Sequence, residues 1–168
     1  MELSSSFKDI PAGSPADVPH QVEGHALQQL AVAWAAGFAD GEGCISIALQ
    51  KFSHGRRPTH RLRFDLVQNN REVLVDFAAA VGVSGPLYAT KRTTLHNRQL
   101  YHLVYDGMSA YEVICRLAPF LRRKRPEAEV AMAYVREARV GWHPGPNGFP
   151  EELWALRDWY RLKLQRLK

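Results

Sequence analysis

Two carboxylates separated by one glycine, Asp40 and Glu42, directly follow an apolar stretch that consists largely of small residues. Carboxylate oxygens suit a hard divalent cation such as Mg²⁺, which keeps several water ligands and also binds phosphate oxygens. Such an ion can activate water for phosphodiester hydrolysis. Taken alone, Asp-Gly-Glu-Gly is a weak signal, because most such tetrapeptides are surface turns. An EF-hand calcium loop is disfavoured, because the downstream ligands at the required spacing are absent.

The stretch before the carboxylates predicts a helix from about Ala26 to Ala39. Six positions between residues 31 and 39 carry alanine or glycine: Ala31, Ala33, Ala35, Ala36, Gly37 and Ala39. Small side chains let a second backbone approach closely, and the simplest use in a soluble protein is a tight crossing of two helices. A plain buried alanine-rich helix is the alternative. Gly41 and Gly43 permit backbone geometries that other residues resist.

The two strands expected next alternate between apolar and polar side chains, which predicts one packed face and one wet face. Polar side chains on such a ribbon can pair with base edges and phosphates in the major groove. The residues expected to contact DNA are Ser46, Gln50, Thr59, Arg61, Arg63 and Asp65, with Lys91, Arg92, Arg98 and His102 from a second hairpin. An ordinary solvated sheet face is the alternative interpretation.

The charge distribution favours a polyanionic partner. The chain has 22 Lys and Arg residues against 17 Asp and Glu, and nine against three between Cys44 and Tyr105. A further basic block covers residues 122–125. Clustered positive charge of this kind is typical of nucleic-acid binding, although a solvated basic face is the alternative. No apolar run approaches the ~20 residues of a membrane span, so no membrane partner is expected.

Cysteine usage and the first residues indicate an intracellular protein. Cys44 and Cys115 lie far apart and in no metal-ligand spacing, which predicts reduced thiols. Residues 1–6 lack the basic-then-apolar order of a secretion signal. The expected location is the cytoplasm or nucleoid of a prokaryote, or an organelle.

Periodicity and turn residues predict two hairpins interrupted by helices. Residues 1–24, rich in Ser, Pro, Ala and Gly, are expected to form a flexible arm. After the first helix, the expected elements are strands at 44–52 and 59–67, a helix from Asn69 or Asn70 to Val81, strands at 87–91 and 99–105, and helices at 109–121, 126–141 and 151–167. Ser109 is expected to cap the first of these last three helices, and Pro126 to open the second. This order predicts an α+β domain with an antiparallel sheet and helices on one face.

Residues 35–43 resemble the nine-letter signature of the LAGLIDADG homing endonucleases. Two further segments resemble this family in the right order. Residues 64–69 match its second strand, which ends in an active-site glutamine, here Gln68. Residues 119–124 match its Pro-Phe-Leu helix end followed by basic residues, with Lys124 at the position of the active-site lysine. The resemblance extends from about Leu27 to Val140.

The resemblance implies an α-β-β-α-β-β-α fold with a four-stranded antiparallel DNA-binding sheet, extra C-terminal helices and a single endonuclease domain over residues 25–168. It implies Mg²⁺-dependent hydrolysis of DNA at a specific site, with no organic cofactor; Mn²⁺ or Ca²⁺ can occupy the same site. Glu42 would bind the metal through its carboxylate and Gly41 through its carbonyl. Gln68 would orient the attacking water, and Lys124 would offset negative charge at the phosphate.

The single motif implies a homodimer, because cutting both strands of a duplex needs two sets of catalytic groups. Two copies would pack their motif helices side by side, giving a partly palindromic target, and the family includes enzymes encoded within group I introns. The residues expected at this interface are Ala33, Ala36, Gly37 and Asp40. Asp40 is interpreted as structural, capping or pairing near the helix crossing.

Two departures from the family pattern stand out. Glu42 occupies a position where many members have aspartate, and Glu72, beside Arg71, occupies one where some members have a basic residue. Two other functions stay open. The first is an RNA maturase or a non-cleaving DNA-binding regulator on the same fold. The second is a basic α+β domain with an unrelated protein partner.

Overall fold

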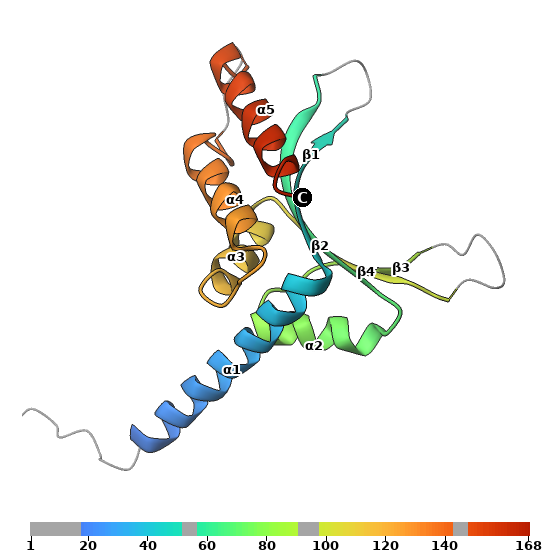
Figure 1. Cartoon of the computed structure of the whole chain (residues 1–168), viewed down its shortest axis with the longest axis vertical. Coiled ribbons are helices and arrows are strands. Elements are labelled where there is room, and N and C mark those ends of the chain that lie inside the picture. Colours follow the sequence, from blue (N-terminus) through green and yellow to red (C-terminus); the bar gives the residue numbers. More distant parts are fainter. Residues whose placement is uncertain (1–17, 52–56, 91–97, 143–147) are drawn as a thin grey trace, which may run out of the picture.

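The computed structural model describes residues 18–51, 57–90, 98–142 and 148–168. Within these ranges the chain forms five helices and four strands (Figure 1). The helices are α1 (Val18–Glu42), α2 (Arg71–Val81), α3 (Met108–Leu117), α4 (Arg125–Glu137) and α5 (Glu151–Gln165), and the strands are β1 (Gly43–Gln50), β2 (Thr59–Gln68), β3 (Leu87–Ala89) and β4 (Tyr101–Asp106). The predicted order of helices and strands is confirmed.

Helix α1 is longer than the sequence predicted at both ends. It begins at Val18 rather than near Ala26, while residues 1–17 of the expected arm lie outside the described ranges. It ends at Glu42, so the two carboxylates belong to its last turn instead of a loop after it. The chain therefore passes from helix directly into strand β1, as Figure 1 shows.

Gly43 is the residue that makes this direct passage possible. A Cβ at Gly43 would lie 2.7 Å from the carbonyl oxygen of Ala39 and 3.1 Å from the ring of Phe64. Only glycine tolerates so close an approach to a backbone oxygen. At Gly41, by contrast, a Cβ would meet nothing within 4 Å, and the residue is helical. Glycine is thus required at Gly43 by this close approach and not by a left-handed φ, and the expectation of special geometry is wrong for Gly41.

The four strands form one antiparallel sheet in the order β1-β2-β4-β3. Strand β2 lies in the middle, where Phe64 pairs with Ile45 on β1 and with Tyr105 on β4. These three side chains are buried and face the helices. Because strand residues alternate between faces, the neighbours of Phe64 on β2, Arg63 and Asp65, face away from the helices.

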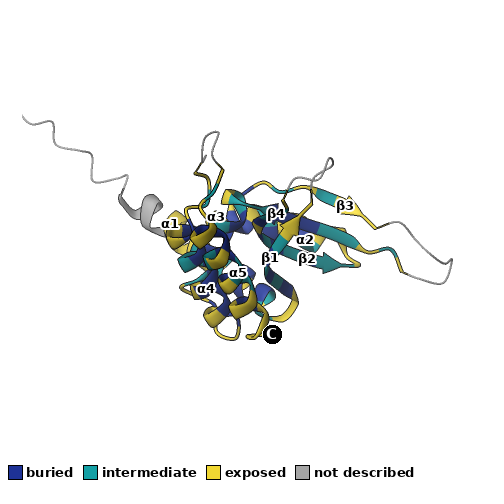
Figure 2. Ribbon diagram, turned by 90° about the horizontal axis from the view of Figure 1, so that it is seen from above, coloured by how far each residue is buried: buried dark blue, intermediate teal, exposed yellow. Residues whose placement is uncertain are grey.

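The core lies between this sheet and the helices (Figure 2). Phe77 of α2 stacks on Phe64 of the sheet, with ring centroids 5.9 Å apart, and Phe38 of α1 packs on Phe77 at 6.2 Å. Buried residues of α3 and α4, such as Ile114 and Tyr134, complete the cluster. The helices and sheet therefore form the α+β layers that the sequence predicted.

Capping residues explain where two helices begin and end. The side chain of Asn70 accepts a hydrogen bond from the backbone N–H of Glu72 at 3.0 Å and opens α2, which stops at Gly82 in the left-handed conformation (φ 63°). The prediction that Ser109 caps α3 is wrong. Gly107 occupies the cap position, and the Ser109 hydroxyl donates to the carbonyl of Asp106 at 2.9 Å.

Helix α5 supports α4 and the β1–β2 hairpin. Buried Arg157 donates to the carbonyl of Ala138 from Nε (3.1 Å) and Nη2 (3.0 Å), which holds the end of α4. Asp158 accepts a 2.8 Å hydrogen bond from Nε2 of buried His60 on β2. Across the described ranges, no helix combines the length and apolar character that a bilayer span requires.

Candidate active site and nucleic-acid interface

Glu42 and Gln68 lie at the same end of the sheet. Gly43 pairs with Leu66, so Glu42 immediately precedes the first pair of the β1–β2 ladder. Gln68 follows Leu66 by two residues on the same strand and pairs with Tyr101 of β4. Glu42 is exposed and Gln68 is half-buried. Glu42 is the last residue of α1 and Gln68 the last residue of β2, so the exposed carboxylate and the amide are brought to the same end of the sheet.

Lys124 lies in a cavity beside the start of β1. This cavity has a volume of about 210 Å³ and is lined by Gly43, Cys44, Ile45, Arg123, Lys124, Glu127 and Lys168. Lys124 occupies the N-cap position of α4, without a capping hydrogen bond from its side chain, and is only 6% exposed. The lysine is thus buried beside the residue that follows Glu42. Glu42, Gln68 and Lys124, the three residues selected by the family resemblance, lie around the junction of α1, β1, β2 and α4.

Sequence reasoning did not identify two other charged residues of this cavity. Glu127 is buried in the first turn of α4, and Lys168 donates through Nζ to the Cys44 sulfur at 3.0 Å. A glutamate after Pro126 fits an ordinary helix start, so its sequence context gave no functional signal. Lys168 is 124 residues from Cys44 in the chain, and no local pattern could bring the two together.

Asp40 connects the end of α1 to the loop before α4. Its Oδ2 accepts the backbone N–H of Arg122 at 2.8 Å, and its Oδ1 accepts that of Lys124 at 2.9 Å. Arg123 adds a hydrogen bond from Nε to the Asp40 carbonyl at 3.0 Å. Partial burial alone would raise the pKa of Asp40, but the backbone N–H groups of residues 122–124 outweigh it and hold the pKa below 3.8. The structural role predicted for Asp40 agrees with these contacts.

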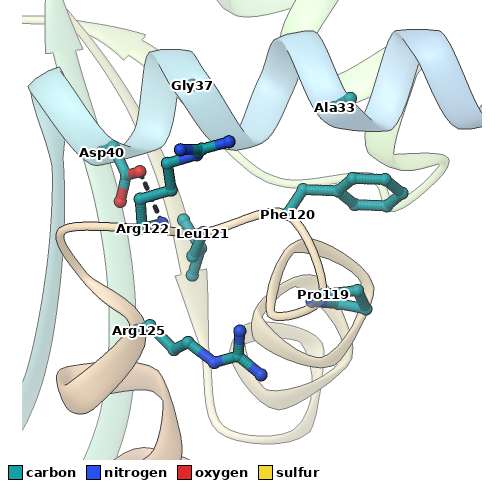
Figure 3. Close-up of a pocket in the computed structure, with 8 residues that line it drawn as sticks. All are labelled: Ala33, Gly37, Asp40, Pro119, Phe120, Leu121, Arg122 and Arg125. Carbon is teal, nitrogen blue, oxygen red and sulfur yellow. Dashed lines mark hydrogen bonds between the residues drawn. The ribbon is translucent and has the colours of Figure 1, made fainter.

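A larger hollow lies on the side of α1 next to this loop. It has a volume of about 570 Å³ and is lined by Ala33, Gly37, Asp40, Pro119, Phe120, Leu121, Arg122 and Arg125. Figure 3 shows the Phe120 ring and the Arg122 side chain reaching from the loop toward α1. Small residues at Ala33 and Gly37 keep this side of the helix accessible.

An exposed apolar stripe, defined as Leu27, Leu30, Trp34, Gly37 and Gly41, runs along α1. Leu27 and Leu30 are each 67% exposed and Trp34 is 44% exposed. The spacing of three and four residues places the whole stripe on one helix face. Sequence reasoning missed its three large residues, although that spacing is visible in the sequence. Apolar surface of this kind is typical of an interface.

The interface residues predicted from the sequence do not all lie on this stripe. Gly37 does, whereas Ala36 is fully buried within its own chain and Asp40 contacts the loop before α4. Ala36 is therefore corrected to a core residue. Ala33 is half-buried at the edge of the hollow.

The outer face of the sheet carries the polar residues expected to contact DNA. The strand register places Ser46, Gln50, Thr59, Arg61, Arg63, Asp65 and His102 on this one face. Arg98 is exposed just before β4, while Lys91 and Arg92 lie outside the described residues. Sequence reasoning missed two neighbours on the same face, Tyr88, whose ring stacks on His102 at 5.3 Å, and Asp106. The hydrogen bonds to Asp106 raise the pKa of Arg63 above its ordinary value.

The donors near Glu42 fit a hard cation that retains most of its waters. Among the described residues, no three His, Cys, Asp or Glu side chains gather closely enough to hold a metal by themselves. Glu42 offers an exposed carboxylate, and the Gly41 carbonyl lies one residue earlier in the last turn of α1. Mg²⁺ is commonly held by one or two carboxylates together with water and substrate phosphates, so this donor set suits it.

Comparison with solved structures identifies the fold. No family model matches the chain, and no curated protein sequence matches it either. The homing endonuclease I-CvuI, solved in complex with its DNA target in the presence of Ca, aligns with a TM-score of 0.67 at 21% identity over 84% of this chain and 83% of that one. Its complex with the I-CreI target in the presence of Mg gives a TM-score of 0.65 at the same identity and the same coverage. The LAGLIDADG meganuclease I-AabMI bound to uncleaved DNA aligns with a TM-score of 0.56 at 21% identity, over 77% of this chain and 44% of its own.

These alignments show that the chain has the LAGLIDADG homing endonuclease fold. The fold expected from the three sequence segments is thereby confirmed. The four-stranded antiparallel sheet and the helix that runs into β1 are the elements that the resemblance implied.

Proposed function

We propose that this protein is a site-specific DNA endonuclease that acts as a homodimer and depends on a divalent metal ion. The observation that carries the proposal is the position of Glu42. It lies at the same end of the sheet as Gln68 and next to the cavity that holds Lys124. The polar outer face of the same sheet offers a surface for duplex DNA. The similar structures described above are complexes with DNA, which supports this choice of substrate.

The residues at this end of the sheet and in the adjacent cavity would have different roles in the reaction. The Glu42 carboxylate and the Gly41 carbonyl would hold Mg²⁺, which supplies an activated water and offsets charge on the leaving oxygen. The Gln68 amide both donates and accepts, so it can orient the attacking water. The Lys124 ammonium stabilises the negative charge that builds up on the phosphate, and its burial strengthens this interaction.

The exposed apolar stripe of α1 supports a homodimer. One chain carries one Glu42, and hydrolysis of both DNA strands requires two. A second copy packed on Leu27, Leu30 and Trp34 would bury them, and Gly37 and Gly41 would let the two helices approach closely. Each Glu42 would then stand at the base of the helix pair, between two sheets that follow the DNA.

The test is cleavage of a plasmid library with randomised inserts, in Mg²⁺ and in EDTA, by wild type and by Glu42→Gln. We expect cleavage to fall by at least about a hundred-fold in the variant while DNA affinity is retained, because the substitution removes a metal ligand and keeps the shape. Glu152→Gln, an exposed carboxylate in the first turn of α5, is the matched control and should cleave as wild type does.

Two outcomes would contradict the proposal. Equal cleavage by wild type and Glu42→Gln would remove Glu42 from the chemistry. Specific DNA binding without any cleavage by wild type would favour the non-cleaving regulator. Accelerated splicing of the host intron RNA would indicate maturase activity, which is measured separately.

A further inference from the structure

Arg63 and Asp106 form a two-point ion pair across β2 and β4 on the outer face of the sheet. Arg63 Nε lies 2.9 Å from Asp106 Oδ1, and Arg63 Nη2 lies 3.3 Å from Asp106 Oδ2. The two residues are direct partners in the strand register, so the backbone fixes their separation. The side chain of Arg63 is 41% exposed and that of Asp106 is 24% exposed. The arginine is therefore oriented in advance and still accessible.

The ion pair uses only one side of the guanidinium. This group carries five N–H donors, and the Nε and Nη2 donors on one side face Asp106. The parallel pair at the end of the group, one N–H on each Nη, is a separate fork. Within the described part of the chain, no hydrogen bond from Nη1 of Arg63 accompanies the pair with Asp106. Because Asp106 holds the guanidinium from one side, the two N–H groups at its end are preorganised for a planar ligand with two adjacent acceptors.

We propose that Arg63, positioned by Asp106, determines specificity by reading a guanine in the major groove. This inference rests on the proposed function, since it requires duplex DNA on the outer face of the sheet. Guanine presents O6 and N7 as two adjacent acceptors, which match the end-on fork. Adenine places a donor beside its N7, and neither pyrimidine offers two acceptors there. Arg63 thus selects guanine among the four bases.

The carboxylate also makes a phosphate contact the poorer alternative. Asp106 places a negative charge about 3 Å from the Arg63 guanidinium, which repels phosphate oxygens and cancels much of the long-range attraction of Arg63. The neighbouring outer-face arginine differs in this respect, because Arg61 donates to the neutral amide of Gln50 at 3.1 Å. Arg63 is accordingly suited to recognise a base, whereas the charge of Arg61 is not offset by a carboxylate and can attract a DNA phosphate.

The experiment is selection from a duplex library with randomised positions, in Ca²⁺, using wild type, the double variant Arg63→Ala/Asp106→Ala, and Arg63→Gln, whose amide matches adenine rather than guanine. The double variant removes both charges, so net charge is unchanged. We expect wild type to enrich sites with guanine at one position in each half-site. Both variants should lose this preference by roughly 5- to 150-fold, the range of one bidentate contact. The affinity of the double variant for random DNA, and the salt dependence of that affinity, should match wild type.

The outcomes separate this inference from the proposed function. Retention of the guanine preference by both variants would overturn the inference and leave the endonuclease proposal intact. So would a weaker salt dependence with an unchanged sequence preference, which would identify Arg63 as a phosphate contact. Enrichment of no sequence by wild type would overturn the proposed function, and the inference with it. Arg63→Gln leaves Asp106 with a hydrogen-bond donor and replaces the guanine-matching fork, so it decides the result if the double variant folds poorly.

Discussion

Asp40 Oδ1 accepts the backbone N–H of Lys124 at 2.9 Å, which joins the last turn of α1 to the first residue before α4. The other carboxylate oxygen accepts the N–H of Arg122 at 2.8 Å. Asp40 is two residues before Glu42, so this carboxylate sets the position of the buried lysine relative to the exposed glutamate. Asp40 therefore holds Lys124 in place at the proposed active site without taking part in the proposed chemistry.

Asp40→Asn tests this connection. Asparagine keeps the shape but offers one acceptor and one NH₂, so one of the two backbone N–H groups would face a donor. We expect a loss of about 1–3 kcal/mol in the free energy of unfolding, measured by urea denaturation, because a partly buried donor loses its partner. Asp76→Asn, at an exposed position on α2, is the control and should change stability by less than about 0.5 kcal/mol. Equal stability of all three proteins would contradict the assigned role.

The same carboxylate predicts a dependence of stability on acid. Hydrogen bonds hold the pKa of Asp40 below its ordinary value of 3.8, so the ionised form is favoured by folding. Its contribution to stability is present above the pKa of the unfolded chain and is lost as the pH falls through the lower folded value. We expect the stability difference between wild type and Asp40→Asn to be constant near neutral pH and to shrink below about pH 4. Urea unfolding between pH 3 and pH 7 measures it, and a constant difference throughout would contradict the pKa direction.

Gly43→Ala tests the passage from α1 into β1. The new Cβ would lie 2.7 Å from the Ala39 carbonyl oxygen, a backbone atom that cannot rotate away. We expect a loss of about 1–3 kcal/mol, the usual cost of forcing extra volume into a packed site. Gly24→Ala is the matched control, because that helical glycine has nothing within 4 Å of the added carbon and alanine favours helices. Thermal unfolding should therefore give a lower Tm for Gly43→Ala and an equal or higher one for Gly24→Ala.

The sequence predicted elements well where the signal was local. Asn70 and Gly82 bound α2 as expected, because a side-chain cap and a left-handed glycine are properties of a few neighbouring residues. Ser109 looked like an equally good cap, yet Gly107 turned the chain earlier and left Ser109 inside α3. Alternation likewise sorted the faces of β1 and β2, because every second side chain must leave the core.

The candidate site needed contacts that no local pattern contains. Family resemblance selected Glu42, Gln68 and Lys124, and the structure adds what holds them in place. Asp40 contacts Lys124 across 84 residues, and Asp106 contacts Arg63 across 43. Small residues on α1 indicated a close helix crossing, but composition alone could not say that Ala36 faces the core of its own chain. Which side of α1 faces the core depends on where the sheet and α2 lie around this helix.

Leu30→Arg tests the stripe on α1 as a dimer interface. Leu30 is 67% exposed in the single chain, so arginine there should leave the fold intact. Two copies would bring these charges into an apolar contact without partners, and we expect the dissociation constant of the dimer to rise by at least about a hundred-fold. Sedimentation measures the mass, and nicking assays should show loss of double-strand cleavage. Leu162→Arg on α5, at a position 47% exposed, is the control and should stay dimeric. A monomeric wild type would contradict the interface.

Arg61→Ala separates the electrostatic part of DNA binding from base recognition. Arg61 is exposed on the outer face and donates to a neutral amide, so its full charge is available to a phosphate. Removing one phosphate contact means that about one counterion fewer is released on binding, so the magnitude of the slope of log affinity against log salt should fall by about 1. Titrations of random duplex DNA between 50 and 200 mM salt would measure this slope, a range over which the Debye screening length falls from about 14 Å to about 7 Å. Arg136→Ala removes an equal charge from an exposed position on α4, which packs on the opposite side of the sheet from the outer face, and should leave the slope unchanged. If both variants lower the slope equally, DNA is bound through net charge and the outer face of the sheet is not the binding surface.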